Sequence, residues 1–135
     1  MAAGVGGLRW AIVIVDLEPV VGHEQGGRRR AVVVSNEPFH RSGRLTVCPI
    51  TAAWSKPRYP NEVAIPNRHA GQTADGVIMC HQVRTIAAQR ARPLELSGGR
   101  GIAYVTDPAI RRDVRDALGR HLGLDIEPEQ DGATG

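Results

Sequence analysis

The chain has 135 residues, 41% of them hydrophobic, a length and composition that predict one folded domain with a hydrophobic core. Lys and Arg together number 17 and Asp and Glu number 14, which excludes an acidic, disordered chain. The longest apolar run, residues 10–15, is too short to cross a membrane, and no signal peptide is evident. Two cysteines are too few for a disulfide scaffold. We therefore expect a cytoplasmic protein without a membrane partner.

The net charge of +3 is unevenly distributed along the chain. Residues 1–124 carry +7 and residues 125–135 carry −4. We predict a single domain over residues 1–124, followed by a disordered acidic tail over residues 125–135. A positively charged domain favours a polyanion such as nucleic acid as its partner.

Short apolar runs predict antiparallel strands over residues 10–15, 31–35, 45–51, 62–65 and 76–80. Pro49 lacks an amide hydrogen and so predicts an edge position or a bulge near the end of the third strand. A helix is predicted to begin after Asp107 as its N-cap, with Pro108 as its first residue, and to end before Gly123. The expected fold is mainly β, a small barrel with one C-terminal helix.

The connection between the first two strands, residues 22–30, is the most unusual segment. Its double glycine allows a close approach of the backbone to a ligand, and three consecutive arginines favour an anion. Because alternate residues of a strand face opposite sides, Arg29 is expected on one face and Arg28 and Arg30 on the other. A solvated basic hairpin tip is the alternative interpretation.

Polar side chains also stand where two other strands end. Thr51 closes the third strand, and residues 81–86 follow the fifth, a position typical of binding groups held by a rigid scaffold. Ordinary strand alternation is the alternative for both. His23 and His81 are candidates for an acid–base pair, because histidine changes charge near neutral pH. Such a pair is one route to the cleavage of RNA. The sequence has no metal-binding spacing, phosphate-binding loop or dinucleotide motif, so neither a metal nor a cofactor is expected.

Several short motifs occur in order along the chain: residues 15–19, 22–27, 31–36, 47–51, 59–63, 75–80, 82–86 and 117–124. Their order and spacing resemble the MazF/PemK family of toxin endoribonucleases over roughly residues 9–124. The resemblance implies an SH3-like barrel of the CcdB/MazF type, with antiparallel strands and a C-terminal α-helix. It also implies a homodimer and a cognate MazE-like antitoxin.

The resemblance assigns roles to particular residues. In the family's pattern, Arg29 and Thr51 are catalytic and Gln82 contacts RNA. The remaining candidates for RNA contact are Arg84, Glu24, Gln25 and Arg28. The implied activity is sequence-specific, metal-independent cleavage of single-stranded mRNA by its own 2′-hydroxyl, which leaves a 2′,3′-cyclic phosphate and a 5′-hydroxyl. Such cleavage would inhibit translation and growth until an antitoxin neutralises the toxin.

Two functions of other classes remain open on the same fold, because function lies in the site and not in the fold. One is a CcdB-like poison of a topoisomerase that does not cut RNA. The other is a barrel that binds RNA without cleaving it. Incubation of the purified protein with bare RNA distinguishes both from a ribonuclease.

Overall fold

The computed structural model describes residues 7–17, 21–22 and 27–124. The main elements in this part of the chain are β1 (Ile12–Asp16), β2 (Arg28–Val33), β3 (Arg44–Thr51), β4 (Glu62–Ile65), β5 (Gly76–Met79), β6 (Arg84–Ala87), β7 (Ala91–Pro93) and α1 (Pro108–Leu122). Short 3₁₀ turns lie between them: η1 (Glu37–Ser42), η2 (His69–Gly71), η3 (Cys80–Gln82), η4 (Ala88–Arg90) and η5 (Ser97–Gly99). The predicted acidic tail lies outside the described residues.

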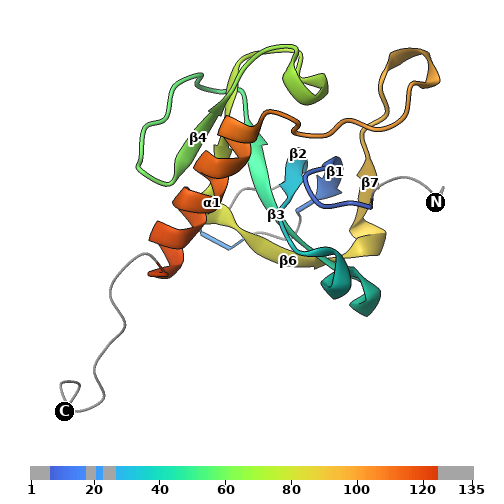
Figure 1. The fold of residues 1–135 in the computed structure, drawn as a ribbon, viewed down its shortest axis with the longest axis horizontal. Coiled ribbons are helices and arrows are strands. Elements are labelled where there is room, and N and C mark those ends of the chain that lie inside the picture. Colours follow the sequence, from blue (N-terminus) through green and yellow to red (C-terminus); the bar gives the residue numbers. More distant parts are fainter. Residues whose placement is uncertain (1–6, 18–20, 23–26, 125–135) are drawn as a thin grey trace.

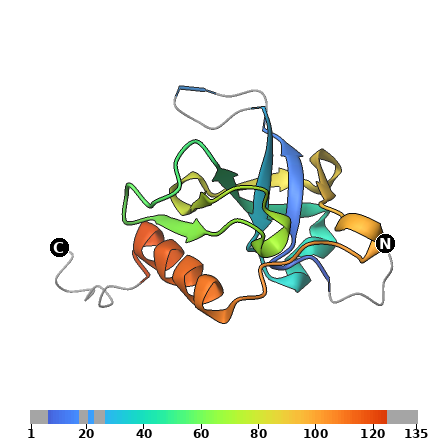
Figure 2. The same ribbon diagram turned by 90° about the horizontal axis from the view of Figure 1, so that it is seen from above.

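The strands of the described residues form one antiparallel sheet in the order β4-β5-β3-β2-β1-β7, and β6 also pairs with β3. The first half of β3 pairs with β6 from Arg44 to Val47, and its end pairs with β5 at Ile50 and Thr51. In Figure 1, α1 lies on the β4 side of the molecule and β7 on the opposite side. Figure 2 shows the sheet curving into the barrel-like fold that the sequence predicts.

Both faces of the central strands β1, β2 and β3 are buried. On one face, a cluster joins these strands to β4, β5 and α1, and it includes Ile12, Val32, Cys48, Ile65, Ile78, Ile110 and Val114. On the other, a smaller cluster lies inside the curved sheet and includes Val13, Val15, Leu17, Ala31, Val33, Val47 and Ile86. Burial on both faces explains why the central strands are continuous apolar runs in the sequence.

The predicted helix is confirmed at both ends. The Asp107 side chain accepts a hydrogen bond from the Ala109 amide at 2.8 Å, and Gly123 caps the C-terminus with φ of 72°. The strand predicted at residues 62–65 also matches its element, and β2 begins at Arg28, earlier than predicted. β1 begins only at Ile12, because Trp10 adopts a φ of 71° that a strand does not accommodate.

Of the two alternatives predicted for Pro49, the edge position is wrong, since β3 lies inside the sheet, and the bulge stays a prediction. Pro49 follows the last pair with β6, at Val47, and precedes the first pair with β5, at Ile50. A residue without an amide hydrogen is tolerated where β3 changes partners. No helix of the described residues has the length and apolar character needed to cross a membrane.

Glu37 ties the segment before β1 to the turn η1. Its carboxylate accepts hydrogen bonds from the Leu8 amide at 2.9 Å and from His40 Nδ1 at 2.7 Å. Partial burial raises the pKa of Glu37, but these hydrogen bonds and that of the Arg9 amide outweigh burial, so the pKa lies below its ordinary value of 4.5. The carboxylate form is therefore favoured in the folded state.

We expect Glu37→Gln to destabilise the protein at neutral pH and to have little effect in acid. A carboxyl whose pKa is lowered by folding contributes stability above its unfolded pKa of about 4.5 and loses it as pH falls through the folded value. Urea unfolding of both proteins, followed by tryptophan fluorescence, measures the difference at each pH. If the two proteins differed by the same free energy of unfolding at neutral and at acid pH, the stabilising role assigned to the Glu37 carboxylate would be wrong.

Candidate functional site

The register of β2 and β3 directs Arg29 and Thr51 to the same end of this strand pair. Ala31 lies opposite Pro49, and Val33 lies opposite Val47. Continuing this register by two residues on each strand places Arg29 opposite Thr51, on the same face of the sheet. The two candidate catalytic residues therefore occupy neighbouring positions at the end of the strand pair.

The three consecutive arginines alternate between the faces of β2, as expected. Arg29 pairs with Val15 of β1, which belongs to the cluster inside the curved sheet. Arg30 pairs with Ile14 and faces the other way. Its guanidinium donates to the Gly71 carbonyl at 2.7 Å, so Arg30 holds the turn before β5. Only Arg29 shares a face with Thr51.

Thr51 is held firmly at the end of β3. Its side chain is 3% exposed, and Oγ1 accepts a hydrogen bond from the Ala53 amide at 3.1 Å, which leaves the hydroxyl proton available for donation. Gly76 of β5 packs against it so closely that an added Cβ would lie 2.4 Å from the Thr51 carbonyl oxygen. A glycine at position 76 is therefore required for this approach of the two strands.

A hollow of about 220 Å³ opens beside this strand pair. It is lined by Arg28, Arg29, Arg30, Ile50, Ala52, Gln72, Thr73 and Ala74. Thr51 is adjacent in sequence to Ile50 and Ala52 but does not line this hollow. Guanidinium groups bind phosphate oxygens through paired N–H donors, so the arginines suit the hollow to a phosphate group.

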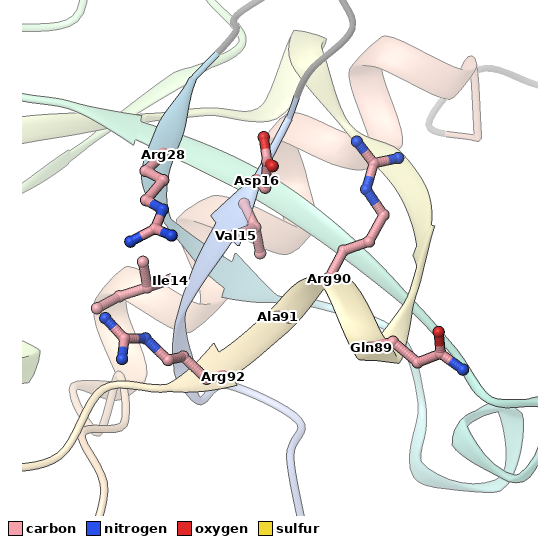
Figure 3. Close-up of a pocket in the computed structure, with 8 residues that line it drawn as sticks. All are labelled: Ile14, Val15, Asp16, Arg28, Gln89, Arg90, Ala91 and Arg92. Carbon is pink, nitrogen blue, oxygen red and sulfur yellow. The ribbon is translucent and has the colours of Figure 1, made fainter.

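A second basic hollow, of about 430 Å³, lies between β1, β2 and β7 and is lined by Ile14, Val15, Asp16, Arg28, Gln89, Arg90, Ala91 and Arg92. Figure 3 shows the guanidinium groups of Arg28 and Arg92 on the same side of β1, with Ile14 between them. Three arginines outnumber the one carboxylate, and Arg28 lines both hollows. Positive charge thus continues from the start of β2 towards β7.

The other candidate residues lie elsewhere. Gln82 belongs to η3 and lines a third hollow, separate from the arginines. Arg84 starts β6, and its guanidinium donates to the Leu17 carbonyl at 3.3 Å, so it supports the chain just after β1. Glu24 and Gln25 lie outside the described residues.

Sequence reasoning missed the residues around Gln82. Trp54, Tyr59 and Glu62 line the same hollow of about 630 Å³. Two signals pointed to them: aromatic residues make up only 4% of the chain, and Tyr59 and Glu62 share one motif. The positions of these side chains depend on how the connection from β3 to β4 folds back over η3.

The two cysteines, Cys48 and Cys80, are free and buried together. A hydrogen bond between the thiols and their burial raise the pKa of Cys48 well above its ordinary value. The thiol is therefore protonated at neutral pH and is not a nucleophile. Within residues 7–17, 21–22 and 27–124, no three His, Cys, Asp or Glu side chains are grouped so that they could hold a metal ion.

Comparison with known protein families identifies the family of this chain. Residues 8–101 match the model of the PemK-like, MazF-like toxins of type II toxin–antitoxin systems. The chain belongs to this toxin family. The match includes β1 to β7, and therefore Arg29, Thr51 and Gln82.

Individual proteins of known activity or structure are also similar to this PemK/MazF chain. Endoribonuclease EndoA of Bacillus subtilis (strain 168) is 41% identical over 83 residues, which cover 61% of this chain and 72% of that protein. A crystal structure of MazF from Deinococcus radiodurans is 32% identical, with a TM-score of 0.61 over 84% of this chain and 94% of that chain. A MazE–MazF structure from the same organism is 28% identical, with a TM-score of 0.63 over 87% and 96%.

Proposed function

We propose that this chain is a toxin endoribonuclease that cleaves single-stranded mRNA at specific sequences without a metal ion. Endoribonuclease activity follows from its family and from its similarity to EndoA. The register of β2 and β3, which when continued by two residues sets Arg29 opposite Thr51, is the observation that supports the proposed chemistry. These two residues are the proposed catalytic groups, and Gln82, Arg84, Arg28, Glu24 and Gln25 are the proposed RNA contacts.

In the proposed reaction, the substrate supplies its own nucleophile. The 2′-oxygen attacks the adjacent phosphorus and gives its proton to solvent water, the bond from phosphorus to the 5′-oxygen breaks, and the 5′-oxygen takes up a proton from water. The products are a 2′,3′-cyclic phosphate and a 5′-hydroxyl. No metal-bound water is needed as the nucleophile in this step.

Arg29 and Thr51 act on the charge that develops at the phosphorus. The guanidinium of Arg29 binds two non-bridging oxygens through its paired N–H groups. The Thr51 hydroxyl donates a further hydrogen bond to the same phosphate. Donors placed in advance at developing negative charge contribute about 10²–10³-fold each to the rate of such reactions.

The proposal extends to partners. By analogy with the MazE–MazF structure of Deinococcus radiodurans, the cognate partner is a MazE-like antitoxin that neutralises the toxin. The chain acts as a homodimer in the cytoplasm, where its mRNA substrate is found. Residues 1–124 form the toxin domain, and residues 125–135 are an acidic tail.

Mapping of cleavage sites on a long RNA in the presence of EDTA tests the proposal. We expect cuts at a short recurring sequence, with 5′-hydroxyl ends that polynucleotide kinase labels directly. Intact RNA that remains bound would identify a non-catalytic RNA-binding barrel. Intact RNA without binding would favour the CcdB-like alternative, and cleavage only without EDTA would exclude a metal-independent reaction.

We expect Arg28→Gln to weaken RNA binding to a similar extent for all sequences. Arg28 is exposed and lines both basic hollows, so it contacts the backbone and not a base edge. Each phosphate contact to a single strand contributes about 0.7 to the slope of log affinity against log salt concentration, and the slope should fall by that amount. Binding titrations at several salt concentrations measure it, and an unchanged slope would exclude the contact.

A further inference from the structure

The hollow beside Gln82 has the composition of a site for a planar ring. Trp54, Tyr59 and His81 bring three aromatic rings to a space of about 630 Å³. The ring centroids of Tyr59 and His81 are 5.8 Å apart at an angle of 64°. Tyr59 is 55% exposed, so its ring is accessible for stacking. Unpaired RNA bases stack on aromatic side chains of this kind.

A buried carboxylate contributes to the same hollow. Glu62 is 5% exposed, and its Oε1 accepts hydrogen bonds from Trp54 Nε1 at 3.2 Å and from the Arg58 amide at 2.7 Å. Its Oε2 is buried and has no hydrogen-bond partner among the described residues. A buried carboxylate oxygen without a partner is costly, and an N–H donor entering the hollow would satisfy it.

The hollow lies on the same face of the sheet as the candidate catalytic pair. Thr51 pairs with Val77 of β5, and Glu62 of β4 pairs with Met79, two residues further along β5. Paired residues share a face, and residues two apart on a strand share that face about 6.6 Å apart. Thr51 and Glu62 therefore lie on one face of the sheet, separated by β5 and by two residues along it. A nucleotide next to the scissile phosphate can place its base in the hollow.

We propose that this hollow binds one base of the RNA beside the cleavage site and selects a base that carries an exocyclic amino group. The inference rests on the proposed function and adds a determinant of its specificity. Tyr59 moves aside to stack on the base, and Glu62 Oε2 accepts a hydrogen bond from the amino group. Cytosine, adenine and guanine provide such a donor. Uracil offers only its N3–H, which lies between two carbonyl oxygens that the carboxylate repels.

Sequencing of cleavage products from a randomised RNA tests the selection. We expect one position next to the cut at which wild type disfavours uracil by about tenfold to a hundredfold. Glu62→Gln retains an acceptor for Trp54 and Arg58 and replaces Oε2 by an N–H donor, so uracil should become accepted at that position. Glu95→Gln is the matched control, because Glu95 is exposed and the charge change is the same. Its sequence profile should equal that of wild type.

Tyr59→Ala keeps the test valid if Glu62→Gln does not fold. Loss of one stacking ring should raise KM by about tenfold or more with little change in kcat. If wild type and both variants cleave with the same sequence profile and KM, the inference is wrong while the proposed function stands. If they lose only antitoxin binding, the hollow is a protein site and the inference is also wrong.

An uncleavable RNA separates the two proposals. A 2′-deoxynucleotide at the cleavage position removes the nucleophile, so binding of such strands can be measured whether or not the protein cleaves RNA. Strands that differ only in the base next to this position should bind wild type more weakly when that base is uracil. Equal binding would overturn the base selection even if no cleavage were ever observed.

Discussion

Arg29→Ala is expected to lower kcat for RNA cleavage by about a thousandfold, the upper end of the loss when one donor to a developing oxyanion is removed. Arg29 is the arginine of β2 that shares a face with Thr51. The loss should appear mainly in kcat, because the contact strengthens as charge accumulates on the phosphate. Rates at saturating RNA measure kcat directly.

Neighbouring arginines provide the controls for Arg29. Arg28→Ala removes the same charge from the adjacent position, which faces the other side of β2, and should affect mainly binding. Arg29→Lys keeps the charge but not the paired N–H groups and should recover only part of kcat. If Arg28→Ala lost as much kcat as Arg29→Ala, the register assigned to the catalytic arginine would be wrong.

Thr51 should act together with Arg29 on the same transition state. Thr51→Ala removes the second donor, and the double variant with Arg29→Ala should lose little more than Arg29→Ala alone, because groups that act together on one transition state are not additive. Full additivity of the two losses would show that Arg29 and Thr51 act independently of each other.

Local signals in the sequence were sufficient to predict some helices and strands but not others. α1 was predicted to the residue because Asp107, Pro108 and Gly123 are caps that act within one turn. β6 and β7 were missed because they are short, exposed in part and polar. They are strands because β3 and β1 present free edges to them, a tertiary effect that no local pattern contains.

The candidate site was likewise predictable from local patterns only in part. Strand alternation alone separated Arg29 from Arg28 and Arg30, because that rule needs only the start of a strand. That Arg29 lies opposite Thr51 depends on the register of β2 and β3, which the chain sets through the burial of both faces. Sequence signals marked individual residues of the aromatic hollow but not the hollow itself, since its lining comes from the connection after β3, from β4, β5 and η3.

Gly76→Ala is expected to destabilise the protein by about 2–3 kcal/mol, the cost of inserting a methyl group into closely packed backbone. The added Cβ would lie 2.4 Å from the Thr51 carbonyl oxygen and 3.5 Å from the Ala52 Cα. These are backbone atoms, so β3 and β5 must separate. Thermal unfolding should show a fall in Tm of roughly 4 °C per kcal/mol for a domain of this size.

Gly119→Ala is the matched control, because the same chemical change should have the opposite sign. Gly119 lies within α1, and an added Cβ there meets nothing within 4 Å. Alanine favours a helix interior over glycine by about 0.5–1 kcal/mol, so Tm should rise. Well below both melting temperatures, Gly76→Ala should also cleave RNA more slowly, since Thr51 is displaced, while Gly119→Ala cleaves at the wild-type rate. Equal rates for the two variants would show that the close contact between Gly76 and Thr51 serves stability alone.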